Sequence, residues 1–234
     1  MIDEQEIETY LSISPNNFCI YLFDKKKITN LYKEELKFEN NVEVIDLSNL
    51  TKFLEDNIYK IEKLTGKFIK NIFLIIDDKE ILNLNIGIKK KNYKEKIDKK
   101  FLENSVAEVK DLINEAHLEN RIMHIIIEKF MVKEKYYQSF EENLYGDQLS
   151  LEIKFLLIPH DFILKFETIL EKYQIKISGY LHKKYIINFF KNNNLELSEM
   201  AYKIQLGCNE NEVQIVPKNS EKKGFFEKFF QLFN

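Results

Sequence analysis

Two short apolar runs, one on each side of an amphipathic segment, restrict the folds open to this chain of 234 residues. Residues 18–23 and 72–76 are apolar throughout. Runs of this length suit buried strands and are far shorter than the roughly 20 residues that cross a bilayer as a helix. Between them, apolar residues recur three or four positions apart, as on one face of a helix: Leu50, Phe53, Leu54, Ile58 and Ile61. The pattern predicts an α/β layer.

The ends of these predicted elements carry their own signals. Ser48 is predicted to cap the helix at its start, and Gly66 is predicted to end it. The acidic residues before position 14 are compatible with a short helix. Residues 81–88 alternate between apolar and polar, as an edge or hairpin strand does.

The stretch from residue 101 to residue 180 predicts a second group of elements. Helical spacing of apolar residues indicates helices over 101–117 and 162–173. Apolar or alternating runs indicate strands over 122–132, 149–158 and 175–180. The order helix, strand, strand, helix, strand suggests a compact α+β unit with both helices on one face of a sheet.

Residue types that carry catalytic chemistry are few and scattered. The six glycines match neither of the phosphate-loop patterns, G-x-G-x-x-G and G-x-x-x-x-G-K-[ST]. His124 lies inside an apolar run and is predicted to be a hydrogen-bonded structural residue. No metal-binding spacing is found among the histidines and cysteines, which are His117, His124, His160, His182, Cys19 and Cys208. We therefore predict a protein that is not an enzyme and binds no cofactor or metal.

Charge and cysteine usage limit the partners and the compartment. The net charge of −3 argues against a general nucleic-acid binder, which would show a basic excess. Two distant cysteines fit a reducing compartment, and the acidic N-terminus does not resemble a signal peptide. These features predict a protein in the cytoplasm, or one attached to a membrane from the cytoplasmic side.

Residues 222–234 predict an amphipathic helix that binds a membrane surface. At about 100° per residue, its apolar side chains fall within one arc of roughly 160°, with lysines near the start. Such a helix can lie flat among lipid headgroups. The alternative is a terminal helix that covers the core of its own domain, but the polar residues 207–221 before it indicate a linker. The predicted membrane-binding residues are Lys222, Lys223, Phe225, Phe226, Lys228, Phe229, Phe230, Leu232 and Phe233.

Much of the chain resembles the bacterial cell-division protein FtsA. The likeness begins at Glu115 and Ala116, follows the run 121–132 and the loop around Gly146, and ends with the strand 175–180. Upstream, residues 44–47 and the helix that ends at Gly66 resemble the first lobe of that family. The tail, with its lysines, glycine and paired phenylalanines, resembles the family's C-terminal membrane helix. The resemblance covers roughly residues 15–180 and 220–234.

The resemblance implies a fold and a set of partners. The implied fold class is α/β (α+β), an incomplete actin-like (ribonuclease-H-like) lobe with the FtsA-type inserted α+β subdomain and a C-terminal amphipathic helix. The implied partners are the lipid surface of the inner membrane, divisome proteins including FtsZ, and further copies of the chain, although the lobe that grips FtsZ has no room here. The implied domains are a partial lobe (14–88), the inserted subdomain (89–180), the remnant of the lobe (181–206), a linker (207–221) and the helix (222–234).

The chain departs from the family where a nucleotide would bind. The first phosphate loop of the family, D-x-G-T-[ST], follows the first strand, where this sequence is read as Asp24 and three lysines. Without glycine, backbone amides cannot close on a phosphate, and we predict no ATP binding.

The leading hypothesis is a non-catalytic FtsA-like cell-division adaptor that attaches divisome components to the cytoplasmic face of the inner membrane. One alternative is a PilM-like cytoplasmic scaffold of a pilus or secretion complex, which would not need a tail of its own. The other is a degenerate actin-like ATPase remnant, which the missing phosphate glycines disfavour.

Overall fold

The computed structural model describes residues 6–38, 43–93, 96–141 and 144–213. Within them the chain forms two compact units. The first unit comprises the chain up to Glu80 together with Asp161–Gln205, and the second comprises Ile81–His160 together with the described residues from Leu206 onward. The second unit is therefore inserted into the first. The mixed α/β class predicted from the sequence is confirmed.

The first unit is built on a mixed five-stranded sheet, in the order β11-β4-β1-β2-β3. The strands β1, β2 and β3 form an antiparallel meander, whereas β4 runs parallel to β1 and β11 runs parallel to β4. The elements of the unit are β1 (Ile7–Ser14), β2 (Asn17–Asp24), β3 (Thr29–Lys37), α1 (Leu47–Thr65), β4 (Asn71–Ile76), α3 (His160–Glu171), β11 (Lys176–His182), α4 (Lys183–Phe189) and α5 (Leu197–Gln205).

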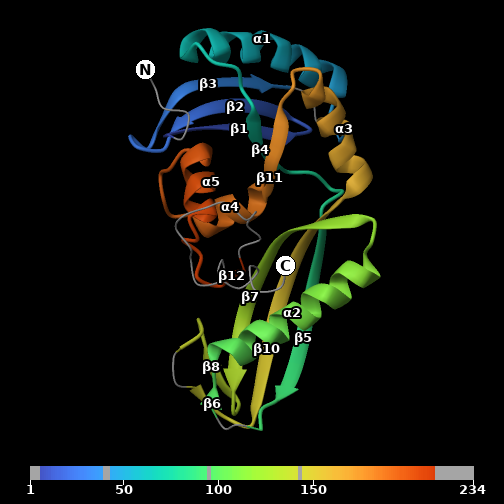
Figure 1. Cartoon of the computed structure of the whole chain (residues 1–234), viewed down its shortest axis with the longest axis vertical. Coiled ribbons are helices and arrows are strands. Elements are labelled where there is room, and N and C mark those ends of the chain that lie inside the picture. Colours follow the sequence, from blue (N-terminus) through green and yellow to red (C-terminus); the bar gives the residue numbers. More distant parts are fainter. Residues whose placement is uncertain (1–5, 39–42, 94–95, 142–143, 214–234) are drawn as a thin grey trace. The chain divides into compact units, whose positions relative to one another are not determined.

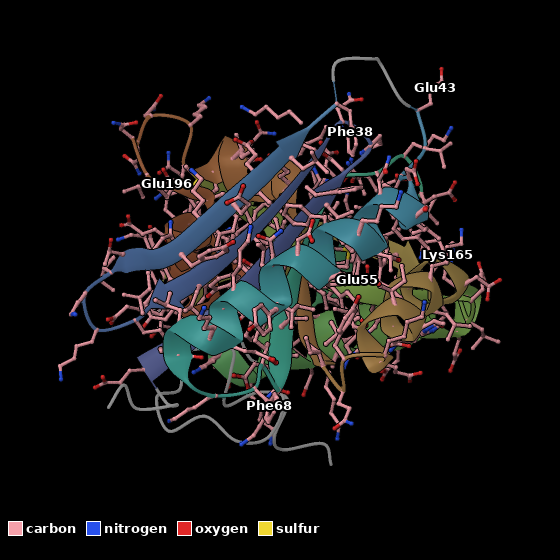
Figure 2. The ribbon with its side chains drawn as sticks, turned by 90° about the horizontal axis from the view of Figure 1, so that it is seen from above. Phe38, Glu43, Glu55, Phe68, Lys165 and Glu196 are labelled. Carbon is pink, nitrogen blue, oxygen red and sulfur yellow. The ribbon has the colours of Figure 1, made fainter. Side chains whose placement is uncertain are left out.

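Helices cover both faces of this sheet (Figure 1). On one face, where α1 and α3 lie side by side in Figure 2, Phe18 of β2 packs against Phe53 of α1 with ring centroids 6.1 Å apart. On the other face, Phe23 of β2 packs against Tyr202 of α5 at 5.4 Å. Because both faces of the sheet are buried, β2 is apolar at every position from 18 to 23 rather than at alternate ones.

Two expectations for the first unit are wrong in detail. The acidic start forms the strand β1 rather than a helix, because it lies between β2 and β4 with Tyr10 and Leu11 buried. The N-cap of α1 is Asp46 rather than Ser48: its Oδ1 atom accepts hydrogen bonds from the backbone N–H groups of Ser48 at 2.9 Å and Asn49 at 3.0 Å. The prediction for Gly66 is confirmed, since it ends α1 with a φ of 69°.

The second unit is an antiparallel sheet with a helix on one face. Its strand order is β12-β7-β10-β5, with β8 paired to β7, and β6 forms a separate pair with β9. Leu102 and Val106 of α2 pack in one core with Phe130 of β7 and Phe155 of β10. The elements are β5 (Leu82–Lys91), β6 (Lys96–Ile97), α2 (Lys99–Ala116), β7 (Asn120–Val132), β8 (Lys135–Tyr137), β9 (Leu144–Tyr145), β10 (Gln148–Pro159) and β12 (Glu212–Val213).

The inserted unit differs from the predicted range 89–180 at both ends. It begins earlier because β5 pairs with β10 along its whole length, from Leu82 opposite Leu157 to Lys91 opposite Gln148. It ends earlier because β11 pairs with β4, so α3 and β11 belong to the first unit. The expectation that residues 101–180 form one unit with two helices on one sheet face is therefore wrong.

The predicted linker 207–221 also begins too early. Glu212 and Val213 form β12, which pairs with Ile126 and Ile125 of β7. Both residues are buried, so this part of the chain belongs to the inserted unit. Residues 209–212 are all polar, which is typical of a linker. Local composition does not show that the side chain of Glu212 is buried.

No helix in the part of the chain that the structure describes is long and apolar enough to cross a membrane.

Candidate functional site

The nine predicted membrane-binding residues lie outside the described residues. They are Lys222, Lys223, Phe225, Phe226, Lys228, Phe229, Phe230, Leu232 and Phe233. Their role remains a prediction from the sequence. The described residues do show what precedes them, and whether the sheet of the first unit has the groups that would hold a phosphate.

The turn that follows the first strand is not the one expected. Since β1 precedes β2, the first hairpin turn runs from Ser14 to Asn17, and the turn at Asp24 is the second. The first turn contains no glycine, and the Ser14 hydroxyl donates to the carbonyl oxygen of Asn17 at 3.1 Å. This turn therefore lacks the glycines that let backbone amides close on a phosphate.

The second turn keeps its own amides occupied. The backbone N–H groups of Lys26 and Lys27 both donate to Oδ1 of Asp24, each at 2.9 Å. These are the amides that would have to point at a phosphate if this turn were a binding loop, and a carboxylate already fills that place. In this second turn, then, Asp24 occupies the two amides that a phosphate would need.

Side chains near the carboxyl ends of the parallel strands are also engaged with one another. Asp77, just after β4, pairs with Lys184 of α4 at 2.9 Å. Burial lowers the pKa of the neighbouring Lys183, although Asp77 opposes that shift. Burial raises the pKa of the Cys19 thiol, which disfavours the reactive thiolate. The ionisable side chains at this end of the sheet are thus either paired with one another or partly buried.

A cavity of about 410 Å³ lies at the opposite end of the same strands. It is lined by the first residues of β1 and β4, including Glu8 and Asn71, and by Phe68, which is 81% exposed and labelled in Figure 2. Glu8 pairs with Lys25 at 3.1 Å in its wall. In open α/β sheets, nucleotides bind outside the carboxyl ends of the strands. The cavity at the amino ends is therefore not placed like a nucleotide site.

The last described strand is fixed to the inserted unit by a buried polar contact. Nδ1 of His124, on β7, lies 2.5 Å from Oε1 of Glu212, on β12, and the two side chains are 2% and 6% exposed. The backbone N–H of Ile127 donates to the carbonyl oxygen of Asn211 at 2.8 Å and extends the attachment. The prediction that His124 is a hydrogen-bonded structural residue is confirmed. Residues 214–234 therefore start from a strand that is held in place.

Sequence reasoning found one member of this pair and missed the other. His124 was recognisable as a polar residue in an apolar run. Its partner is 88 positions away in a polar stretch, and only the alternation of Val213 and Ile215 with polar residues could have indicated a strand there. Within the described ranges, no group of three or more His, Cys, Asp or Glu side chains could hold a metal ion.

In sequence, the chain matches no family profile and no curated protein. In structure, it is similar to the PilM–PilN type IV pilus biogenesis complex, at 9% identity and a TM-score of 0.46 over 78% of this chain and 49% of that chain. It is also similar to the cytoplasmic domain of EpsL, an inner membrane component of the type II secretion system of Vibrio cholerae, at 5% identity and a TM-score of 0.35 over 77% of this chain and 57% of that chain.

A third similar structure, from Bacteroides thetaiotaomicron, is described as a protein with an actin-like ATPase fold. Its identity is 12% and its TM-score 0.31, over 83% of this chain and 61% of that chain. The chain thus spans between about half and three fifths of the length of these structures. Likenesses with TM-scores below 0.5 assign no activity, and the resemblance to FtsA is not repeated among these three. The function has to be argued from the residues of this chain.

Proposed function

We propose that this chain is a non-catalytic scaffold protein that holds partner proteins at the cytoplasmic face of a membrane, attached through residues 222–234. The observation that carries the proposal is the fixed position of β12. Because Glu212 and His124 anchor that strand in the inserted unit, only eight residues, 214–221, separate the strand from the amphipathic segment. The helix would thus be presented by the insert.

The energetics favour weak, reversible attachment by one tail. Each buried phenylalanine contributes about 1.5–3 kcal/mol, but ordering a segment of this length on the membrane costs about 1–2 kcal/mol per residue. Several tails carried by one assembly would bind more tightly through effective concentration. Such behaviour suits a scaffold that assembles at a membrane and leaves it again.

A matched pair of substitutions tests the tail. Phe229→Glu and Gln231→Glu introduce the same charge on opposite faces of the predicted helix. We expect Phe229→Glu to abolish co-sedimentation of the full chain with vesicles containing anionic lipid, and Gln231→Glu to weaken it only slightly. Deleting residues 222–234 should move the protein to the soluble fraction of cells. An unchanged membrane fraction after that deletion would rule out the anchor.

The absence of ATP binding is a separate part of the proposal. The engaged amides of Lys26 and Lys27 and the glycine-free turn at residues 14–17 support it. Isothermal titration of the full chain with Mg-ATP should give no binding heat. A micromolar affinity would contradict this part and leave the membrane attachment untouched.

The partner complex can take two forms. One is a pilus or secretion complex, with the chain as its cytoplasmic scaffold on the inner membrane. The other is the cell-division machinery, which rests on the sequence resemblance to FtsA alone, and we do not place it first. Co-purification with a tagged full-length chain from membranes, followed by identification of the retained proteins, distinguishes the two.

A further inference from the structure

The two sheets end in edge strands of different character. At the edge of the first sheet, β3 carries charges of both signs, and a register shift interrupts its pairing with β2 beside Phe23. Charges and bulges are common means of blocking an edge. At the edge of the second sheet, β5 pairs with β10 over ten residues without a register shift, and residues 82–88 carry no charge. The β5 edge has none of these protections over most of its length.

The backbone groups at this edge can be identified from one hydrogen bond. The N–H of Asn92 donates to the carbonyl oxygen of Asp147 at 2.7 Å, one position beyond the pair Lys91–Gln148. In an antiparallel ladder, hydrogen-bonded residues alternate with residues whose N–H and C=O groups point the other way. The even-numbered residues of β5 therefore bond to β10. The groups of the odd-numbered residues point away from it: Asn83, Asn85, Gly87, Lys89 and Lys91.

We propose that this edge pairs antiparallel with β5 of a second copy of the chain, about a two-fold axis at Ile86. Among the described strands, β5 has β10 as its only neighbour in the sheet, so the outer edge can accept a strand. A two-fold interface requires a surface that is complementary to itself. The side chains of β5 meet that requirement on both faces.

At the centre of the face covered by α2, the pairing joins apolar side chains to apolar side chains. Leu84, Ile86 and Ile88 are only half-buried in the single chain, and they pack against the core that includes α2. With the axis at Ile86, each Leu84 lies opposite Ile88 of the other copy, and the two Ile86 side chains face each other. In this register Lys90 lies opposite the exposed Leu82, whereas an axis shifted by one residue to Gly87 would set Lys90 opposite the half-buried Leu84.

On the other face, the pairing separates the positive charges. Lys89 and Lys91 lie on this face at one end of β5, whereas Lys90 lies on the face covered by α2, where it pairs with Glu108. Antiparallel pairing places them at opposite ends of the joint ladder, with Lys89 opposite Asn83. Parallel pairing would place like charges side by side, which destabilises a sheet. The charge distribution therefore selects the antiparallel arrangement, and both copies of α2 then cover the same face of one continuous sheet.

Two short edge strands bury little surface, so this is a weak interface of the transient class. A dimer also carries two C-terminal segments, so any membrane attachment gains from effective concentration. The pairing itself does not rest on that attachment, because it is tested in solution.

Cysteine cross-linking tests the register. In the full chain with Cys208→Ser, Ile86→Cys places two thiols across the axis, with Cα atoms about 4.5 Å apart in a non-hydrogen-bonded pair, within disulfide range. The matched control Ile88→Cys leaves them roughly 13 Å apart along the strands. We expect rapid cross-linked dimer for Ile86→Cys and little for Ile88→Cys. Equal cross-linking of both, or none, would overturn the register.

Charge substitutions at one exposed position test the pairing without cysteines. Asn83→Lys sets a lysine opposite Lys89 of the other copy, and Asn83→Glu sets a carboxylate there. Sedimentation over a concentration series should show the dimer weakened about three- to tenfold by the first and strengthened by a similar factor by the second. The control Asn114→Lys, on the exposed face of α2, should change nothing. The proposal would be refuted if the protein stayed monomeric at every concentration. It would also be refuted if both Asn83 variants dimerised as strongly as the unsubstituted protein.

Discussion

At the scale of single residues, the contact between His124 and Glu212 holds the last described strand in the inserted unit. Both side chains are almost fully buried, and burying polar groups is costly unless they bond to one another. The contact stabilises the fold because each group satisfies the other in a place that water does not reach. Other close pairs of the inserted unit lie at its surface, where water and salt weaken them. Lys129 and Glu152, 2.5 Å apart with both side chains more than 40% exposed, are such a pair.

Removing the buried carboxylate should therefore cost more than removing an exposed one. We expect Glu212→Ala to lower the free energy of unfolding by about 1–3 kcal/mol, because the carboxylate that pairs with the buried His124 ring is lost. The control Glu152→Ala should cost less than about 1 kcal/mol. Urea unfolding followed by circular dichroism measures both. Equal costs would mean that the buried contact adds no stability.

At the scale of elements, α1 shows how a helix is fixed at both ends. Asp46 has extended backbone angles, φ −80° and ψ 101°, so its side chain can turn back onto the first amides of the helix. Gly66 adopts the left-handed conformation that ends it, and its N–H donates to the carbonyl oxygen of Glu62 at 2.8 Å. Between these ends, one apolar face packs on the sheet. Asp46 and Ser48 are both good capping types, so composition alone could not decide between them.

Substitution separates the two candidate caps. Asp46→Ala should destabilise the first unit by about 0.5–2 kcal/mol, since two amides lose their acceptor. Ser48→Ala should change the free energy of unfolding by less than about 0.5 kcal/mol. Thermal unfolding of the two variants compares them directly. A larger loss for Ser48→Ala than for Asp46→Ala would show that the helix begins later than the structure places it.

At the scale of the whole molecule, each of the two units has core residues of its own among the described residues. Leu102 belongs to the core of the inserted unit, together with Phe130 and Phe155. Leu54 of α1 belongs to the first unit. Two units with their own cores can open separately, and amide exchange reports the opening of each.

We expect the same truncation to act on one unit at a time. Leu102→Ala should lower the free energy of unfolding of the inserted unit by about 2–5 kcal/mol. Amide exchange should become faster in β7 and β10 and stay nearly unchanged in β1 and β4. Leu54→Ala should do the reverse. Exchange measured by mass spectrometry resolves these strands. If both variants accelerated exchange everywhere, the chain would be a single cooperative unit.

The sequence by itself determined the elements whose signals are local. The runs 18–23 and 72–76 are strands because each residue there is apolar, and α1 is a helix that ends at Gly66 because its apolar spacing and its stop lie within one segment. The alternation over residues 81–88 predicted an edge or hairpin strand, and β5 lies at the edge of its sheet.

Only the tertiary structure decided which elements share a sheet. It assigned β11 to the sheet of β4, turned the acidic start into a central strand, and buried Glu212 against His124, which is 88 positions away. Strand pairing and burial join residues that are far apart in the chain, and such contacts leave no periodic pattern in either segment. For that reason the sequence predicted the strands and helices with strong local patterns, whereas β1, β12 and the boundaries of the inserted unit came from the fold.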